Sequence, residues 1–322
     1  MRNYILRRII ITIPLLFVIS IMSFFIMQLS PGSYLDQIKM NPDISPELIE
    51  TMEEDFGLDK SVPVQYLYWL KELLQGNLGE SFTYRIPVAE IIGSRLLNTF
   101  ILSAAAMIIA WGISIPVGVY SATHHYSILD NIFTTFSFIG LSIPNFFFAL
   151  LLLFLIVRLN IPLPISGMTS IMYDYMTPVE KVIDIAKHLI VPAVVLGTAS
   201  TASLMRQMRG QMLDVINQDY IRTARAKGLK ERKVIYKHAL KNALNPMITI
   251  FGFQLSSLFS GAALTEIVTG WPGLGNMMLT AVRSKDLYLA MAGMMMGSLM
   301  LIIGNLAADI MLALNDPRIS YD

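Results

Sequence analysis

Long runs of apolar residues recur along the chain, and shorter segments between them carry most of the charge. Six runs are long enough to cross about 30 Å of hydrocarbon as α-helices. They are Ile9–Leu29, Leu97–Ser121, Ile132–Val157, Leu189–Met205, Met247–Ile267 and Leu289–Leu314. The pattern predicts an all-α integral membrane protein with six transmembrane helices.

The composition agrees with a membrane protein. Hydrophobic residues make up 54% of the chain and charged residues 15%, whereas soluble domains carry about 25% charged residues. The basic N-terminus is typical of a signal peptide, but its apolar run of about 20 residues favours a retained first helix. The chain has no cysteine, so disulfides and thiol chemistry are excluded.

The distribution of basic residues predicts the orientation. Arg2, Arg7 and Arg8 precede the first run, so the positive-inside rule places the N-terminus in the cytoplasm. Six crossings then place the loop after the fourth run, and the C-terminus, in the cytoplasm as well. That loop contains Asp219–Pro246, which we call the basic stretch. Its basic residues are Arg222, Arg225, Lys227, Lys230, Arg232, Lys233, Lys237 and Lys241.

These signals divide the chain into five regions. They are the first helix (1–29), an extracytoplasmic cap (30–96), the membrane core (97–314), a cytoplasmic loop within that core (206–246) and a cytoplasmic tail (315–322). The cap is rich in acidic residues and too short to build an enzyme core.

Two short patterns in the cap predict helices. Ser45-Pro46-Glu47 is typical of a helix N-terminus. Val64–Leu74 has apolar residues at helical spacing, so we expect it to lie on the membrane surface or to pack on the bundle.

The sequence offers little for catalysis. The phosphate-binding, metalloprotease and serine-hydrolase motifs are absent, and the adjacent His124 and His125 do not form a metal site without further ligands. Glu266 and Asp309 are the acidic residues nearest the predicted helices, and a local hydrogen bond or an interfacial position accounts for them better than proton transport. We expect no catalytic, metal-binding or cofactor-binding residues.

The basic stretch has the pattern of short helices joined by turns. Arg206–Ile216 continues the fourth run, and Tyr220–Lys227 is a second helix that Gly228 ends in a left-handed conformation. Glu231–Ala243 is a third helix, and Asn245-Pro246 then predicts the start of the fifth membrane helix. The short central helix could transmit a push from a partner protein, or its charge could bind anionic lipid headgroups.

The loop Thr269–Tyr288 begins with Gly270-Trp271-Pro272-Gly273. Proline followed by glycine predicts a type II turn. Trp271 is expected at the membrane interface, where aromatic residues are enriched.

The basic stretch resembles the EAA motif of ABC importer permeases, E-A-A-x3-G-x9-I-x-L-P. Aligned on Gly228, the motif falls on Arg222-Thr223-Ala224, His238 and Leu240, with Lys241 where proline is usual. Arg222, His238 and Lys241 depart from the general motif. These departures agree with the B-type permease subunits of dipeptide, oligopeptide and nickel importers, whose loop reads like DYIRTARAKGL…HAL. The segments YILRRIIITIPLLFVIS, VPVQYLYWLKELLQGNLGESF, EIVTGWPGLG and NDPRISYD are also similar to that subfamily.

The resemblance implies a type I ABC importer permease fold in the cell membrane of a prokaryote. Such a subunit forms half of a pore with a C-type permease. An extracytoplasmic solute-binding protein delivers the solute, and two ABC ATPase subunits bind ATP and Mg²⁺. The implied coupling residues are Arg222, Thr223, Ala224, Arg225, Lys227 and Gly228. We expect a gate facing the binding protein at Glu266, Trp271, Pro272, Gly273 and Gly275.

The resemblance favours peptides as the solute, and similar importers carry nickel, glutathione or oligosaccharides. Membrane lipid is a further expected partner, and nucleic acid is not. Three other hypotheses remain from the residues alone: an ion-coupled carrier, which would need an ionisable group near the midplane, an intramembrane enzyme, and a non-transporting scaffold.

Overall fold

The computed structural model describes residues 2–29, 34–39, 59–257 and 263–315, together with single residues at 32, 47, 49, 51, 53 and 57. Apart from one isolated antiparallel bridge between Glu80 and Pro87, the regular structure of these ranges is helical. The predicted all-α class is therefore confirmed. The predicted helix start at Ser45-Pro46 and the tail beyond Asn315 lie outside the described residues.

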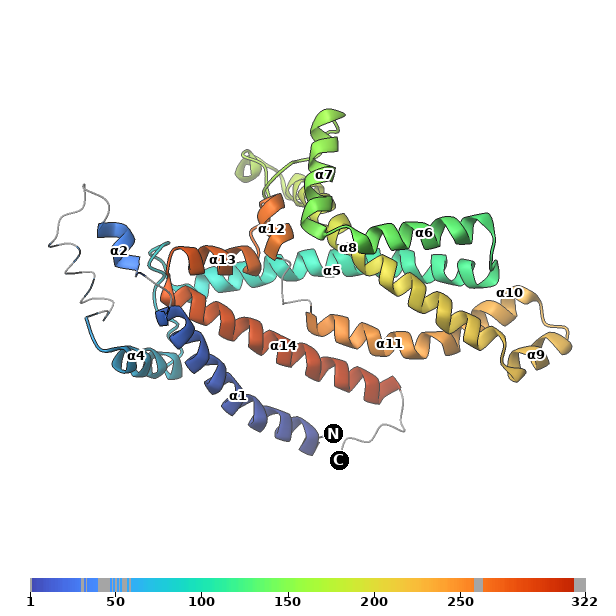
Figure 1. Ribbon diagram of the computed structural model, residues 1–322, viewed down its shortest axis with the longest axis horizontal. Helices are drawn as coiled ribbons and strands as arrows, with labels where there is room; N and C mark the ends of the chain where they lie inside the picture. The colour runs from blue at the N-terminus through green and yellow to red at the C-terminus, as the bar shows by residue number, and fades with distance from the viewer. Residues whose placement is uncertain are drawn as a thin grey trace.

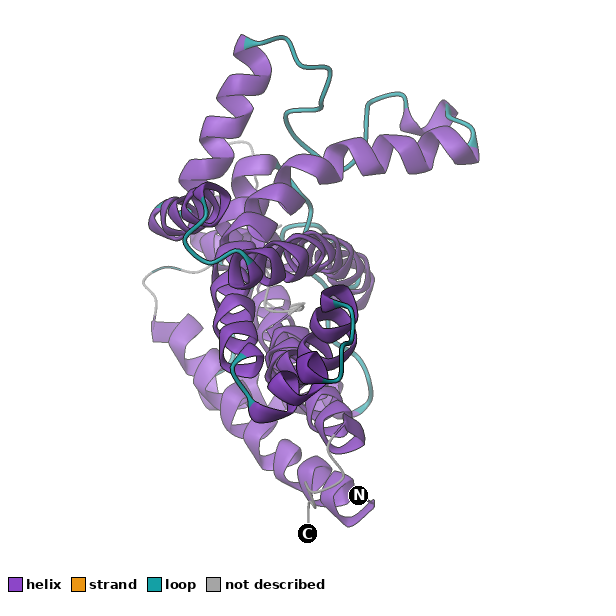
Figure 2. Ribbon diagram, turned by 90° about the vertical axis from the view of Figure 1, so that its right-hand side faces the viewer, coloured by secondary structure: helices purple, strands orange, loops and turns teal. Residues whose placement is uncertain are grey.

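Figure 1 shows α5 (Val88–Thr123) and α11 (Leu240–Ser257) along the longest axis of the molecule. Three further long helices are inclined to that axis: α1 (Arg2–Leu29), α14 (Leu287–Asn315) and α8 (Pro178–Ile216). The longest of them, α8, packs most extensively on α5. Figure 2 looks along this axis and shows the helices gathered in a bundle, with an arm extending from it.

Four described helices are long and apolar enough to cross a membrane. The qualifying ranges are Ile10–Leu29, Val88–Thr123, Pro178–Ile216 and Leu287–Ile310. A fifth crossing is added if α6 (Ile128–Ser142) and α7 (Asn145–Arg158) together form one span. The predicted span Met247–Ile267 falls on α11, on residues 258–262 outside the described ranges, and on α12 (Ala263–Thr269).

The predicted span Ile132–Val157 is broken near its middle, because α6 and α7 meet at an angle of 106°. Pro144 has no backbone N–H, and its ring disfavours the helical conformation of the residue before it. Ile143 accordingly adopts an extended conformation, with φ −91° and ψ 123°. The helix ends there, and α7 leaves the bundle in a new direction (Figure 1).

The predicted helix start at Asn245-Pro246 is also wrong. After α9 (Asp219–Ala226), the chain forms α10 (Glu231–Lys233), a π-helical segment η2 (Val234–Ala239) and then α11. Pro246 lies inside α11. Because the preceding segment is already helical, the proline removes one backbone hydrogen bond rather than starting a new helix.

Two apolar clusters hold the opposite ends of the bundle together. At the end that carries α9, which we call the basic end, the second halves of α5 and α8 pack with α9, η2 and α11. At the opposite end, α1 and α14 pack with the start of α5, with α4 (Val62–Leu74) and with α13 (Leu274–Arg283). The short α2 (Tyr34–Lys39) and the 3-10 turn η1 (Tyr173–Tyr175) complete the described helices.

A buried carboxylate fixes the loop before α5 to the start of α14. Asp286 is fully buried and directly precedes α14. Its Oδ1 accepts a hydrogen bond from Leu289 N at 3.1 Å, and its Oδ2 accepts from Ser81 Oγ at 2.5 Å and from Thr83 N at 3.0 Å. One side chain therefore both closes a helix N-terminus and ties down a distant loop.

Replacing Asp286 should loosen this end of the bundle. We expect Asp286→Ala to cost about 1–3 kcal/mol, because the Ser81, Thr83 and Leu289 donors lose a buried acceptor. Thermal unfolding in detergent and limited proteolysis of residues 77–87 measure the effect. Asp174→Ala, at an exposed position, is the matched control, and equal stability of the two variants would contradict this role.

Candidate functional site

Helix α9 is held against the bundle by one narrow face. Ile221 and Ala224, three residues apart, are buried against the cluster that includes Met212, Val234 and Ala239. Residues three apart share one face of a helix, so the intervening positions point outward. Helix α9 therefore packs on the bundle through Ile221 and Ala224 and exposes the rest of its surface.

Most of the predicted coupling residues lie on this outward surface. Arg222, Thr223, Arg225, Lys227 and Gly228 are all exposed. Ala224 is the exception, because only 8% of its surface is exposed. The prediction grouped Ala224 with residues that contact a partner, whereas the structure places it in the packing beneath them.

Gly228 ends α9 in the predicted left-handed conformation, with φ +72°. Gly228 N donates to Arg225 O at 2.9 Å and Leu229 N donates to Ala224 O at 3.4 Å. These two bonds form a Schellman motif, which turns the chain sharply after a helix. No other atom lies within 4 Å of the position that a Cβ would take, so the glycine is required by the backbone rather than by crowding.

An ion pair closes the turn around Gly228. Arg225 Nη2 lies 2.7 Å from Glu231 Oε1, which joins α9 to α10. Hydrogen bonding to Arg225 lowers the pKa of the Glu231 carboxyl, and the same contact raises the pKa of the Arg225 guanidinium. The two side chains are 40% and 55% exposed, so solvent screens the pair and its main effect is to orient the turn.

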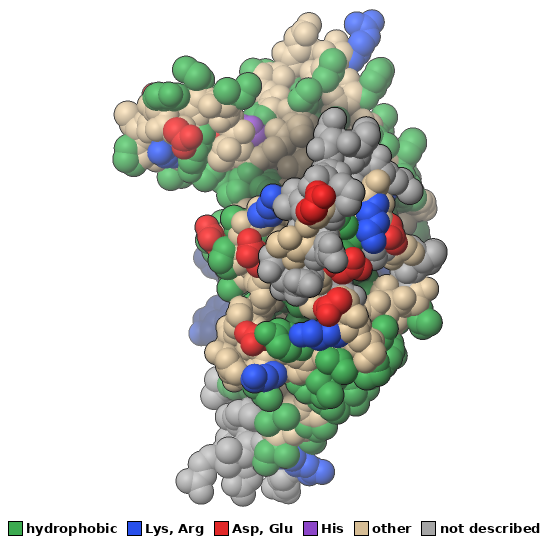
Figure 3. All heavy atoms as spheres, turned by 90° about the vertical axis from the view of Figure 1, so that its left-hand side faces the viewer, with side chains coloured by type: hydrophobic (Ala, Val, Ile, Leu, Met, Phe, Trp, Pro, Cys, Tyr) green, Lys and Arg blue, Asp and Glu red, His purple; other side chains and the backbone are tan. Residues whose placement is uncertain are grey.

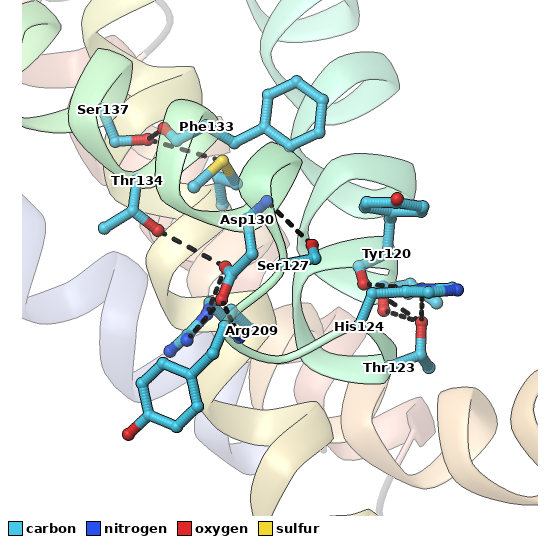
Figure 4. A network of polar contacts seen from close by, with 12 residues as sticks. Tyr120, Thr123, His124, Ser127, Asp130, Phe133, Thr134, Ser137 and Arg209 are labelled. Carbon is cyan, nitrogen blue, oxygen red and sulfur yellow. Dashed lines mark hydrogen bonds and ion pairs between the residues drawn. The ribbon is translucent and has the colours of Figure 1, made fainter.

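A second, buried ion pair joins the α5–α6 hairpin to α8 (Figure 4). Arg209 Nε donates to Asp130 Oδ1 at 2.9 Å and Arg209 Nη2 donates to Oδ2 at 3.0 Å. The Asp130 side chain is 2% exposed, and its Oδ2 also accepts from Tyr126 N at 3.0 Å. A bidentate pair of this kind is strong and directional, and it attaches the hairpin to the last third of α8.

Sequence reasoning missed this pair. The spacing Ser127-x-x-Asp130 is the signature of a helix N-terminus, and Ser127 Oγ does accept from Asp130 N at 3.2 Å. That signal could have identified Asp130. No local pattern points to Arg209, which lies 79 residues further along the chain.

At the opposite end, Glu266 is fully buried and makes the local hydrogen bonds expected for it. Its Oε1 accepts from Thr99 Oγ1 at 3.0 Å, and its Oε2 accepts from Asn276 N at 2.9 Å. Asn276 is the third residue of α13, so the carboxylate caps that helix and faces the positive end of its dipole. Thr99 Oγ1 in turn accepts from Leu274 N at 2.7 Å, which ties α5 to the same helix start.

The predicted type II turn at Trp271–Gly273 is wrong. Gly273 has φ −95°, outside the left-handed region that such a turn requires. Instead Gly270, with φ +65°, ends α12 in a Schellman motif: Gly270 N donates to Ile267 O and Trp271 N donates to Glu266 O. The chain therefore turns at the C-terminal cap of α12 and not at Pro272-Gly273.

Trp271 is packed inside the bundle. Its side chain is fully buried, and Nε1 donates to Asn98 O at 3.0 Å. Asn98 Nδ2 donates in return to Pro272 O at 3.0 Å. The indole N–H is therefore satisfied by α5, and the interfacial position of Trp271 stays a prediction.

The structure brings the five predicted gate residues together around the junction of α12 and α13. Gly273 lies against the Glu266 carboxylate, where a Cβ would overlap it, and Gly275 lies against Ala263. Glu266, Trp271 and Gly273 are buried, and Pro272 and Gly275 are partly buried. The cluster is tightly packed, and the hydrogen bonds of Thr99 join it to α5.

Asp309 forms an ion pair within the chain as well. Arg8 Nη2 lies 2.9 Å from Asp309 Oδ2, which brings the beginning of α1 and the last part of α14 to one end of the bundle. The described residues contain no group of three or more His, Asp or Glu side chains placed to hold a metal ion.

Comparison with known proteins identifies the family of this chain. A family model described as the inner membrane component of binding-protein-dependent transport systems matches residues 114–321. A model of the N-terminal part of such membrane components matches residues 1–103. The chain belongs to this family. It is a multi-pass membrane protein and a transport-system permease component.

Full-length relatives extend the comparison. The oligopeptide transport system permease protein AppB of Bacillus subtilis is 43% identical over 323 residues, which cover 100% of both chains. The dipeptide transport system permease protein DppB of Escherichia coli K12 is 36% identical over 338 residues, and the di/tripeptide permease protein DppB of Pseudomonas aeruginosa is 34% identical over 334. Each comparison covers 100% of this chain and 99% of the relative.

The Asp130–Arg209 pair should be essential for the stability of this permease. Arg209→Gln leaves a buried carboxylate without its counter-ion, which typically costs about 3–5 kcal/mol. We expect a lower melting temperature in detergent than for Arg206→Gln, which removes an exposed arginine one turn earlier on α8.

A double variant sharpens this test. Asp130→Asn combined with Arg209→Gln removes both charges, so it should be more stable than Arg209→Gln alone. Additive losses in the double variant would show that the two side chains do not interact.

Proposed function

We propose that this chain is the B-type permease subunit of an ATP-driven importer and forms half of a pore for peptides. The observation that carries the proposal is full-length similarity to permeases named for oligopeptides, dipeptides and di/tripeptides. The chain itself does no chemistry. Its role is to change shape when partner subunits bind and hydrolyse ATP.

The proposed assembly has five subunits. A C-type permease completes the pore, two ABC ATPases bind ATP and Mg²⁺, and an extracytoplasmic solute-binding protein delivers the peptide. The family description supports the binding protein. The absence of a phosphate-binding motif from the sequence supports ATP binding by other subunits.

We propose six crossings, with both ends of the chain in the cytoplasm. The Arg8–Asp309 contact brings the start of α1 and the last part of α14 to the same end, which favours an even number of crossings. Counting α6–α7 and α11–α12 as one crossing each gives six. The arginines before the first crossing and the basic stretch after the fourth support a cytoplasmic position for the basic end.

Helix α9 is the proposed docking element for an ATPase subunit. Its outward surface carries Arg222, Thr223, Arg225 and Lys227, whereas its inward residues Ile221 and Ala224 pack on α8 and η2. A force applied to the outward surface therefore reaches both the end of α8 and the start of α11. Helix α8 has 39 residues, and its first turns lie far from α9 (Figure 1). A tilt of α8 at the basic end would therefore displace its first turns.

The α12–α13 junction is the proposed gate at the opposite end. Glu266 and Thr99 bind the start of α13 to α5, so opening must break or carry along these hydrogen bonds.

Uptake measurements test the proposed function. Vesicles containing the permease pair and both ATPases, with ATP at the ATPase side and the binding protein at the other, should accumulate a labelled di- or oligopeptide. Omitting any one partner should abolish uptake. Peptide uptake driven by an ion gradient in vesicles of this chain alone would instead establish an ion-coupled carrier.

Two substitutions at Gly228 separate backbone geometry from partner contact. Gly228→Val should abolish ATP-dependent uptake, because a β-branched residue disfavours φ +72° by about 1–2 kcal/mol and the turn after α9 is lost. Gly228→Asn should retain most uptake, since asparagine adopts this conformation more readily. Both variants should insert normally into the membrane. Equal, normal uptake by both would refute the role of this turn.

A further inference from the structure

Helix α4 has two apolar faces, and only one of them is used within the chain. Tyr66 and Trp69 face inward and are buried in the cluster with Phe24, Ile92 and Leu289. The opposite stripe follows the spacing i, i+3, i+4, i+7 and i+10 and is exposed. It consists of Val64, Leu67, Tyr68, Lys71 and Leu74, and the exposed fractions of Leu67 and Leu74 are 61% and 82%.

Such a stripe does not suit a helix that faces water. A helix on the surface of a soluble structure carries polar residues on its outward face, and a contiguous exposed apolar patch marks a binding surface. Four of the five outward residues of α4 are apolar or aromatic. The outward face therefore requires an apolar environment.

The contacts with α1 show which part of that helix α4 lies beside. The Tyr66 hydroxyl is 2.9 Å from Ser20 Oγ, the Tyr66 ring packs on Phe24 at 5.4 Å between centroids, and Gln28 Nε2 donates to Gln65 Oε1 at 2.9 Å. All three α1 residues belong to the candidate span Ile10–Leu29. Phe24 lies five residues inside the end of that span, or about 7 Å at 1.5 Å per residue.

The first turns of α14 also lie beside α4. Leu289 and Met291 belong to the cluster that contains Trp69, and both lie near the beginning of the candidate span Leu287–Ile310. Helix α4 therefore sits beside two membrane helices, within their apolar ranges. The residues Met22, Phe25 and Ile26 of α1 are also exposed, so α1 carries an apolar surface of its own at the same level of the bundle.

We propose that α4 is an interfacial helix whose outward stripe enters the lipid at the end of the bundle opposite the basic end. Amphipathic helices bury their apolar face about 5–10 Å into the boundary between headgroups and acyl chains, and the contacts of α4 with the last turns of the apolar range of α1 suit such a position. Lys71 interrupts the stripe, and the Lys60 ammonium lies over the Tyr68 ring at 4.9 Å. Both lysines can extend toward lipid phosphates.

The view of this end of the molecule agrees with an interfacial position. Charged side chains gather over the middle of the end face, and hydrophobic side chains border them on one flank (Figure 3). In Figure 1, α4 lies beside the end of α1, away from α9. A helix in the membrane interface would steady the first span at the level where the gate cluster closes.

The absence of cysteine from the sequence allows a direct test. Single variants Val64→Cys and Leu67→Cys carry a nitroxide label in the assembled importer, reconstituted in lipid vesicles. Electron paramagnetic resonance then measures the accessibility of each label to oxygen, which concentrates in lipid, and to a nickel chelate, which stays in water. Phe25→Cys on α1 is the lipid control, and Asp174→Cys in the exposed loop before α8 is the water control.

We expect the labels at Val64 and Leu67 to resemble Phe25, with oxygen accessibility above chelate accessibility, and the opposite order at Asp174. A chelate-dominated label at both α4 positions would overturn the proposal in favour of a water-facing helix. Low accessibility to both reagents would overturn it in favour of a protein partner on this face. Peptide uptake measured on the same vesicles reports the proposed transport function separately.

Discussion

Buried carboxylates placed at helix N-termini are the constraint on which this bundle depends. The first amide groups of a helix have no partner within the helix, and apolar surroundings offer no water to satisfy them. Glu266 accepts from the third amide of α13, and Asp286 accepts from the third amide of α14. Asp130 lies in the first turn of α6 and accepts from Tyr126 N just before it, while Ser127 Oγ binds the third amide of that helix. In each case the same carboxylate also contacts a residue far away in the sequence.

Each of these carboxylates therefore bonds near a helix start and also links that helix to a distant part of the chain. Asp130 attaches the α5–α6 hairpin to α8 through Arg209, Glu266 attaches α13 to α5 through Thr99, and Asp286 attaches α14 to the loop before α5. Apolar packing between membrane helices is weakly specific, because lipid tails are as apolar as the side chains they compete with. The directional bonds of three carboxylates therefore fix which helices meet, and in which register.

The sequence predicted the features that depend on local chemistry. Apolar length identified α1, α5, α8 and α14, and the glycine after a basic helix identified the Schellman turn at Gly228. Where prediction failed, a proline had two possible roles. Pro144 breaks a span and Pro246 does not, because the segment before Pro246 is already helical. The burial of Trp271 against α5 could not be predicted either, because Asn98 O accepts its N–H, a contact between residues 173 apart.

The two short helices at opposite ends illustrate how outward chemistry distinguishes partners. Both α9 and α4 pack on the bundle through two inward residues, Ile221 and Ala224 in one and Tyr66 and Trp69 in the other. Their packing alone gives no reason to assign them different roles. The outward face of α9 is basic and polar, which suits a protein surface in water, whereas that of α4 is apolar, which suits lipid. A motion driven through α9 would therefore act on a bundle whose other end is held in the membrane interface. Under that condition a push at one end tilts α8 instead of displacing the whole subunit.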